Sequence, residues 1–75
     1  MPITGLLLTC ESGRLDGVRE VVASRTLSEA RETRGAALVV VTDTATIDED
    51  RAEVEALSKL DGVLAAHVVF TNIED

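Results

Sequence analysis

The last third of the chain constrains the fold most. The stretch Leu60–Phe70 reads Leu-Asp-Gly-Val-Leu-Ala-Ala-His-Val-Val-Phe. Gly62 stands where a helix would end, because glycine adopts a left-handed backbone most easily. The β-branched run behind it predicts a strand that is apolar at nearly every position. A strand with one wet face should alternate, so this strand calls for cover on both of its faces.

The segments before this strand complete a βαββαβ order. The patterns predict strands over residues 3–10, 27–33, 36–42 and 63–70, a helix over about 13–23, and a second helix between Thr46 and Gly62. This order is typical of the ferredoxin-like α+β fold. It predicts one domain over residues 1–75, with a four-stranded antiparallel sheet in the order 4-1-3-2 and both helices on one face. Only residues 73–75 are expected to form a free tail.

Local signals place the two helix starts. Ser12 is a plausible N-cap for the first helix. Thr46 and Glu49 fit a capping box for the second, in which the Glu49 side chain reaches back to the amide of Thr46. The acidic residues near this start lack the spacing of a calcium loop, and capping with solvation explains them. No metal site is therefore expected.

Composition narrows the classes of function. Fourteen acidic and seven basic residues give a net charge of −7, which repels nucleic acid and suits either solubility or a basic partner. Phe70 is the only aromatic residue of the Phe, Tyr and Trp class, which argues against a base-stacking surface. Cys10 is the single cysteine and is expected in the core. The Leu6–Leu8 run is too short to insert into a membrane, so a cytoplasmic protein is predicted.

The strand faces define a candidate contact surface. Because helices cover one face only, and because Phe70 fills space best, the predicted core face holds Leu6, Leu8, Val39, Val41, Ala66, Val68 and Phe70. The uncovered face is then predicted to hold Ile3, Leu7, Leu38, Val40, Ala65, His67 and Val69. An apolar patch of this kind marks a binding surface for a partner or for another copy of the chain.

Nothing in the sequence assembles a catalytic site. His67 has no serine or cysteine partner that the pattern brings to it, and it is interpreted as a packing or surface residue. No glycine-rich phosphate loop is present, and no cofactor is expected. Asn72 is the only asparagine and lies near the end, away from where an acylphosphatase-like site would require one. An enzyme is the least supported class.

Three stretches carry a family resemblance. They are the apolar first strand followed by Ser12–Leu15, the strand Gly35–Val41, and the run Leu60–Phe70 with its Gly-Val-Leu start and Val-aromatic finish. Together they span most of the chain. On these stretches the chain resembles the NapD family of small cytoplasmic assembly chaperones for periplasmic nitrate reductase.

The resemblance implies a function and a way of binding. Such a protein binds the twin-arginine signal peptide of the molybdenum-containing subunit and holds back export until the cofactor is loaded. The apolar middle of the peptide would lie on Leu7, Leu38, Val40 and Val69, as a helix lies in a groove. Carboxylates at the rim, such as Glu11, Glu29 or Glu74, would pair with the two arginines. A chaperone of this kind is expected to be mainly monomeric.

A second interpretation remains open. ACT-type and Lrp-type regulatory modules share the strand order and bind ligands at subunit interfaces. In that case the uncovered face would be buried in a homodimer. Ser12–Gly13 is the only trace of a ligand loop after the first strand.

Overall fold

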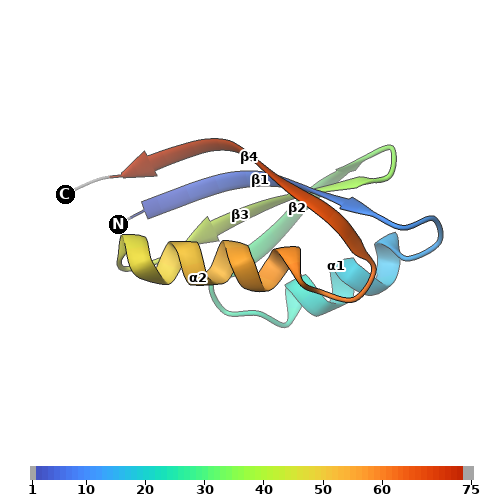
Figure 1. Cartoon of the computed structure of the whole chain (residues 1–75), viewed down its shortest axis with the longest axis horizontal. Coiled ribbons are helices and arrows are strands. Elements are labelled where there is room, and N and C mark those ends of the chain that lie inside the picture. The colour runs from blue at the N-terminus through green and yellow to red at the C-terminus, as the bar shows by residue number, and fades with distance from the viewer. Residues whose placement is uncertain (1, 74–75) are drawn as a thin grey trace.

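The computed structural model of the protein describes residues 2–73 and follows the predicted βαββαβ order (Figure 1). Its elements are β1 (Pro2–Cys10), α1 (Leu15–Ala23), β2 (Ser28–Arg34), β3 (Ala37–Asp43), α2 (Ile47–Ser58) and β4 (Val63–Ile73). The bounds differ from the prediction by a few residues at element ends. Ile73, placed by the sequence in a free tail, is instead the last residue of β4, and residues 74–75 lie outside the described part.

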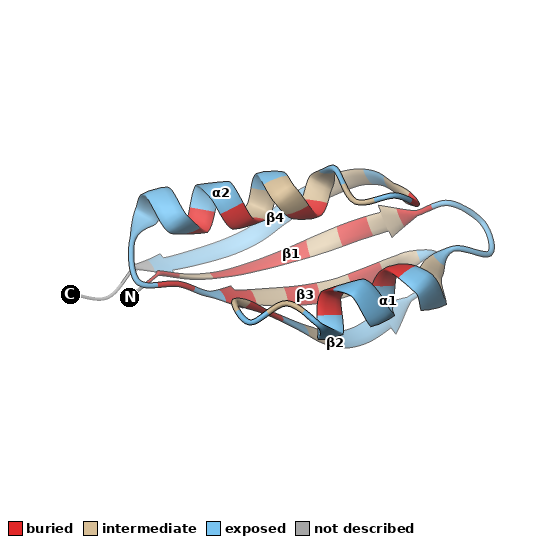
Figure 2. Cartoon of the chain, turned by 90° about the horizontal axis from the view of Figure 1, so that it is seen from below, coloured by how far each residue is buried: buried red, intermediate tan, exposed pale blue. Residues whose placement is uncertain are grey.

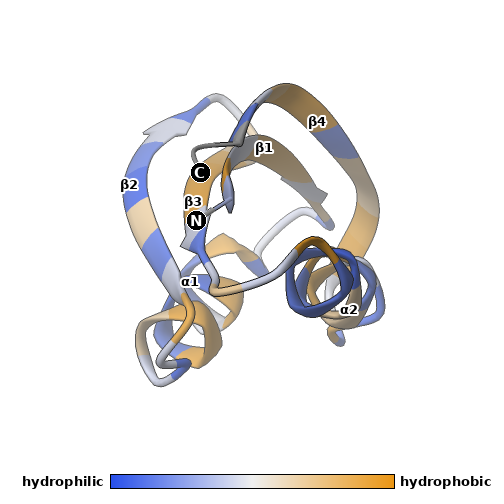
Figure 3. Ribbon diagram, turned by 90° about the vertical axis from the view of Figure 1, so that its left-hand side faces the viewer, coloured by the Kyte–Doolittle hydropathy of each residue, from blue (hydrophilic) through white to orange (hydrophobic). Residues whose placement is uncertain are grey.

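The four strands form one antiparallel sheet in the order β2-β3-β1-β4, which confirms the predicted topology. β1 and β3 are the inner strands and carry many buried residues, whereas β4 is exposed along most of its length (Figure 2). Both helices lie on the same side of the sheet (Figure 3). The fold therefore leaves one complete face of the sheet without helical cover.

The start of α2 follows the predicted capping box closely. The Glu49 backbone N–H donates to Thr46 Oγ1 at 3.1 Å. The Glu49 carboxylate accepts in return from the backbone N–H of Ala45 at 2.9 Å, one residue before the predicted donor. Both bonds satisfy amides that an uncapped helix start would leave without partners.

The start of α1 differs from the prediction. Arg14 holds the N-cap position, and among the described residues no side chain caps it, so Ser12 is not the cap. The chain turns at Gly13, which has a φ of +81°, and this turn keeps Ser12 outside the helix. Arg14 is held instead by Asp61, at 2.5 Å between Nη2 and Oδ2. Gly62 has a φ of +94°, but it lies in the turn that leads into β4, because α2 already ends at Ser58 with Lys59 as its C-cap.

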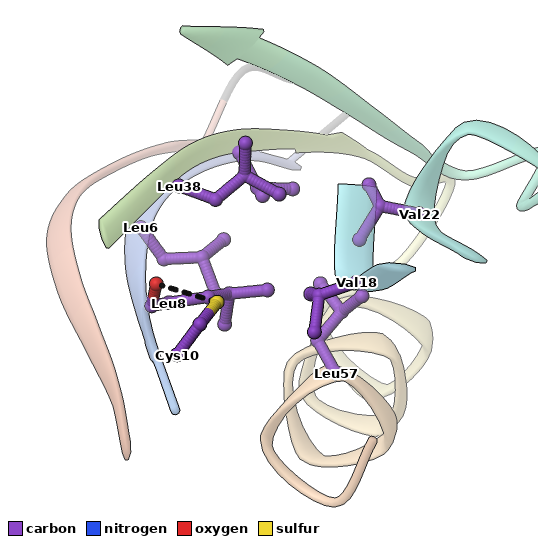
Figure 4. Close-up of a cluster of buried hydrophobic side chains, with 8 residues drawn as sticks. Leu6, Leu8, Cys10, Val18, Val22, Leu38 and Leu57 are labelled. Atoms are coloured by element: carbon purple, nitrogen blue, oxygen red, sulfur yellow. Dashed lines mark hydrogen bonds between the residues drawn. The ribbon is translucent and has the colours of Figure 1, made fainter. Parts of the chain in front are cut away.

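The hydrophobic core lies between the sheet and the two helices (Figure 4). Its buried members are Leu6, Leu8, Cys10, Val18, Val22, Leu38, Val40 and Leu57. Cys10 is thus confirmed as a core residue, and burial raises the pKa of its thiol.

The predicted face assignment is wrong for β3. Leu38 and Val40 are fully buried, at 0% exposure each, while Val39 and Val41 are only partly buried. The pairing with β1 gives the reason: Leu6 stands opposite Val40, and Leu8 stands opposite Leu38. Directly opposed residues share a face in an antiparallel sheet. Leu38 and Val40 therefore join the core through their β1 partners.

Two buried carboxylates fasten α2 to its neighbours. Asp50 accepts hydrogen bonds from the hydroxyls of Thr4 at 2.7 Å and Thr42 at 2.6 Å. It is therefore a bridge between α2 and the two inner strands, and not one of a solvated group of acids as the sequence suggested. These two hydrogen bonds hold the start of α2 in place over the inner strands.

Glu53 is the second buried carboxylate. It accepts two hydrogen bonds from Arg25, both at 2.7 Å, and another from Ser28 Oγ. The hydrogen bonds from Arg25 lower the pKa of Glu53, against the opposing effect of burial. A charged, paired Glu53 therefore links α2 to the segment that enters β2.

Candidate functional site

The sheet face opposite the helices, called the open face below, is the candidate binding surface. The register decides which side chains reach it, because opposed residues share a face. Leu7 of β1 stands between Val39 of β3 and His67 of β4. By the same reasoning the open face contains Ile3, Gly5, Leu7, Thr9, Ala37, Val39, Val41, Ala65, His67 and Phe70. Its centre is an apolar surface over the inner strands.

The structure brings most of the predicted contact residues to this face. Ile3, Leu7 and Ala65 are partly buried there, and His67 is exposed there. Val69 lies in a bulge of β4 and lines the same hollow as Leu7. The remaining two, Leu38 and Val40, are in the core and cannot contact a partner.

Phe70 lies on the open face and not in the core as predicted. The register between β1 and β4 shifts between Gly5 and Leu6, where Leu6 pairs with Val68 and Gly5 pairs with Phe70. Val69 is the extra residue of this bulge, and it reverses the alternation beyond it. The sequence pattern assumes unbroken alternation and therefore places Phe70 on the wrong face.

Gly5 provides the seat for the Phe70 ring. A Cβ atom at position 5 would lie 2.2 Å from Phe70 Cε1 and 2.7 Å from Cδ1. The ring therefore rests directly on the β1 backbone, and only glycine leaves room for it. Half of Phe70 is still exposed, at 50%, so the ring offers its outer side to a partner.

Two adjoining hollows shape the open face. The first has a volume of about 270 Å³ and is lined by Gly5, Leu6, Leu7, Arg34, Val39, Val41, Val69 and Phe70. The second has a volume of about 380 Å³ and is lined by Ile3, Thr26, Leu27, Ser28, Glu29, Arg31, Val41 and Asp43. Val41 lines both hollows, so they adjoin each other. The first hollow is mainly apolar, and the wall of the second includes charged side chains.

The family model for the NapD protein matches residues 1–75. The chain belongs to the NapD family. In fold it is similar to the solution structure of the E. coli Tat proofreading chaperone protein NapD, with a TM-score of 0.85 and 19% sequence identity. That likeness covers 97% of this chain and 79% of the E. coli chain. No curated protein matches the sequence.

The rim of the open face in this NapD family member carries exposed charges on β2. Glu29 lies 3.6 Å from Arg31, and Glu32 lies 3.4 Å from Arg34. All four side chains are more than half exposed, so these pairs are weak and exchange readily. Of the predicted arginine partners, Glu29 lines the second hollow, and Glu11 lies 3.9 Å from Arg14 in the turn after β1. Glu74 lies outside the described residues.

The described part of the NapD fold offers no constellation for metal chemistry. Among residues 2–73, no three His, Cys, Asp or Glu side chains are grouped so that they could hold a metal ion. Within the same residues, none of the helices has the length and apolar character that crossing a membrane requires.

Four apolar residues of the open face escaped the sequence prediction: Ala37, Val39, Val41 and Phe70. For Val39 and Val41 a usable signal existed in the β2–β3 hairpin, which opposes Glu32 to Val39 and Glu29 to Val41, because charged residues favour the uncovered face. For Phe70 the signal was Gly5, a glycine inside an apolar strand, which often marks a close backbone approach. The bulge at Val69 left no mark in the sequence pattern.

Proposed function

We propose that the chain is a Tat proofreading chaperone that binds the N-terminal twin-arginine signal peptide of an exported, nitrate reductase-like molybdoenzyme. Binding delays export until the cofactor is loaded. The observation that carries the proposal is the NapD family match over residues 1–75. A signal peptide is read before export, so the proposed place of action is the cytoplasm. The role needs binding and no chemistry, and we propose that the protein is not an enzyme.

The open face supports this proposal through its shape. An apolar peptide helix lying across the first hollow would contact Leu7, Val39, Val41, Val69 and Phe70. Val69 is 64% exposed, and with Phe70 it offers apolar area that binding can remove from water. These two side chains stand next to each other on β4, and an exposed aromatic ring beside an apolar hollow is a usual anchor for a peptide.

Charge supports the same arrangement. The net charge of −7 favours approach of the basic start of a twin-arginine peptide. Glu29 borders the second hollow together with the apolar residues Ile3 and Val41. A peptide arginine that replaced Arg31 as the partner of Glu29 would place the basic start next to the apolar middle. We therefore propose Glu29 as an arginine partner.

Calorimetry with the signal peptide of a co-encoded molybdoenzyme tests the proposal. Leu7→Glu, Val39→Glu and Val69→Glu should each weaken binding by about tenfold or more, because each puts a charge into the apolar contact. Replacing both peptide arginines by lysine should weaken binding less than these three substitutions do. High salt should make the effect of this replacement smaller, because salt screens charge pairs.

Val21→Glu is the matched control. Val21 is 44% exposed on α1, and the helices pack on the opposite side of the sheet. This variant adds the same charge and should bind the peptide as the unmodified chain does. Folded protein that shows no heat and no competition at high micromolar peptide would contradict the proposed function. Equal weakening by Val21→Glu would show that the peptide does not bind specifically on the open face.

A further inference from the structure

The β2 edge of the sheet carries a short repeat in its sequence. Residues 29–34 read Glu-Ala-Arg-Glu-Thr-Arg, so a glutamate is followed two positions later by an arginine, twice in succession. The register of β2 against β3 shifts between Ala30 and Glu32. Arg31 is the extra residue of this bulge, and it reverses the alternation of side chains beyond it. Two glutamates three positions apart, which regular alternation would place on opposite faces, therefore share one face.

The strand register shows that this shared face is the open face. Glu29 pairs with Val41, and Glu32 pairs with Val39, and both valines lie on the open face. Each glutamate therefore begins a row of open-face residues that crosses all four strands. Both rows lead from a carboxylate on β2, over the inner strands, to a ring on β4. The two rows are Glu29–Val41–Gly5–Phe70 and Glu32–Val39–Leu7–His67.

Each glutamate is held by an arginine of the same strand, and both pairs are loose. Nη1 of Arg31 lies 3.6 Å from Oε1 of Glu29, and Nη2 of Arg34 lies 3.4 Å from Oε1 of Glu32. The ion pair that joins α2 to the segment before β2 is much shorter, at 2.7 Å. All four residues belong to β2, so neither pair fastens one element to another. Exposed pairs of this kind break at little cost.

The two arginines of these pairs also line the two hollows of the open face. Arg34 lines the first hollow, and Arg31 lines the second. In the free chain, each guanidinium group therefore lies between a β2 carboxylate and an apolar wall. An arginine that is followed by apolar residues, as in a twin-arginine signal peptide, needs the same surroundings. A carboxylate also suits the forked guanidinium group better than the compact ammonium group of lysine.

We propose that Glu29 and Glu32 each receive one arginine of the peptide, and that Arg31 and Arg34 hold these carboxylates until the peptide arrives. This inference rests on the proposed function of the open face. The two rows are two residues apart on β3, about 7 Å, which the long side chains of two adjacent arginines can span. The incoming arginines displace Arg31 and Arg34 into water, so two ion pairs are exchanged for two others. The apolar part of the peptide then runs from β2 toward Phe70.

Calorimetry with the twin-arginine peptide measures this exchange as a double-mutant cycle. Arg31→Gln should tighten binding by about threefold, because the carboxylate of Glu29 then has no partner to give up. Glu29→Gln alone should weaken binding by at most about twofold, because it removes one pair before binding and one after it. In a chain that carries Arg31→Gln, the same Glu29→Gln should weaken binding by about fivefold, because only the pair with the peptide is lost. Arg34 and Glu32 should behave in the same way.

Arg51→Gln is the matched control. It removes the same charge from an exposed position on α2, on the other side of the sheet, and should leave peptide affinity unchanged. Arg31→Gln should also leave unchanged the affinity for a peptide in which both arginines are replaced by glutamine. All these variants should keep the circular dichroism spectrum of the unmodified chain, because the replaced side chains of β2 are more than half exposed.

The outcomes separate this exchange from the proposed function. A peptide that binds with the same affinity before and after Arg31→Gln and Arg34→Gln would overturn the exchange and leave the proposed function intact. Tightening of the same size by Arg51→Gln, or by Arg31→Gln in a chain that carries Glu29→Gln, would also overturn it, since net charge would then be the cause. A folded chain that binds no peptide at all would overturn both proposals.

Discussion

The reversal of faces on β3 leads to a sharp stability prediction for two adjacent valines. Val40 is fully buried beneath α1 and α2, whereas Val39 lies on the open face and is partly buried. Both are strand residues of the same type, so Val39→Ala and Val40→Ala lose the same strand propensity. Any difference between the two variants therefore reports packing.

The magnitude follows from burial. Val40→Ala removes two methyl-sized groups, at about 0.8 kcal/mol each, and leaves a cavity that the surrounding side chains fill only in part. The expected loss is about 2–3 kcal/mol. Val39→Ala should cost at most about 1 kcal/mol, because water and neighbouring side chains reach the site. A 75-residue chain has a total stability of roughly 4–11 kcal/mol, so the first loss is a large share of it.

Urea denaturation followed by circular dichroism measures both values on the same scale. The slope m should stay constant between the two variants, so that the midpoints alone report stability. In thermal melts, Val40→Ala should lower Tm by about 10–20 °C. A loss for Val39→Ala equal to or larger than that for Val40→Ala would refute the register between β1 and β3 on which the open face rests.

Three further outcomes are expected. Because the hydrogen bonds from Arg25 lower the pKa of Glu53 below its usual 4.5, this pairing stabilises the fold above about pH 4.5 and is lost as the pH falls through the lowered value. Glu53→Gln should therefore reduce stability at pH 7 and flatten its fall in acid, as urea midpoints at several pH values would show. Thr46→Ala should cost about 1 kcal/mol in a urea titration through loss of the helix cap. Gly5→Ala should displace the Phe70 ring. It should reduce the free energy of peptide binding, measured by calorimetry, by more than it reduces the free energy of unfolding, measured by thermal melts. Peptide affinity equal to that of the unmodified chain would contradict the role of the ring.

The fold was predictable from the sequence because its signals are local. Gly62 has a positive φ in the turn between α2 and β4, and Thr46 caps the start of α2, as the sequence indicated for that cap. The βαββαβ order of the elements is compatible with only a few sheet topologies. Each of these features depends on residues only a few positions apart, and a single sequence contains that information.

The open face was predictable only in part because it depends on pairing between distant strands. Both faces of β3 are apolar, so alternation gives two sets of residues without saying which set is inside. The opposition of Leu6 to Val40 decides the matter, and it joins residues far apart in the chain. On β4, the bulge at Val69 inverts the pattern for Phe70. The large volume of its side chain predicts a core position for Phe70, but the ring packs over Gly5 on the open face.

The Phe70 ring over Gly5 also makes the protein its own spectroscopic probe. The chain contains one phenylalanine and no tyrosine or tryptophan, so Phe70 supplies the only benzene ring, and the imidazole of His67 is the other aromatic ring on the open face. The α protons of Gly5 lie beneath the Phe70 ring and should resonate upfield of their usual position. A peptide that moves the ring would shift this signal, and a peptide that covers the ring in place would not. Proton spectra without any label would thus reveal whether Phe70 is a fixed anchor or a side chain that yields to the ligand.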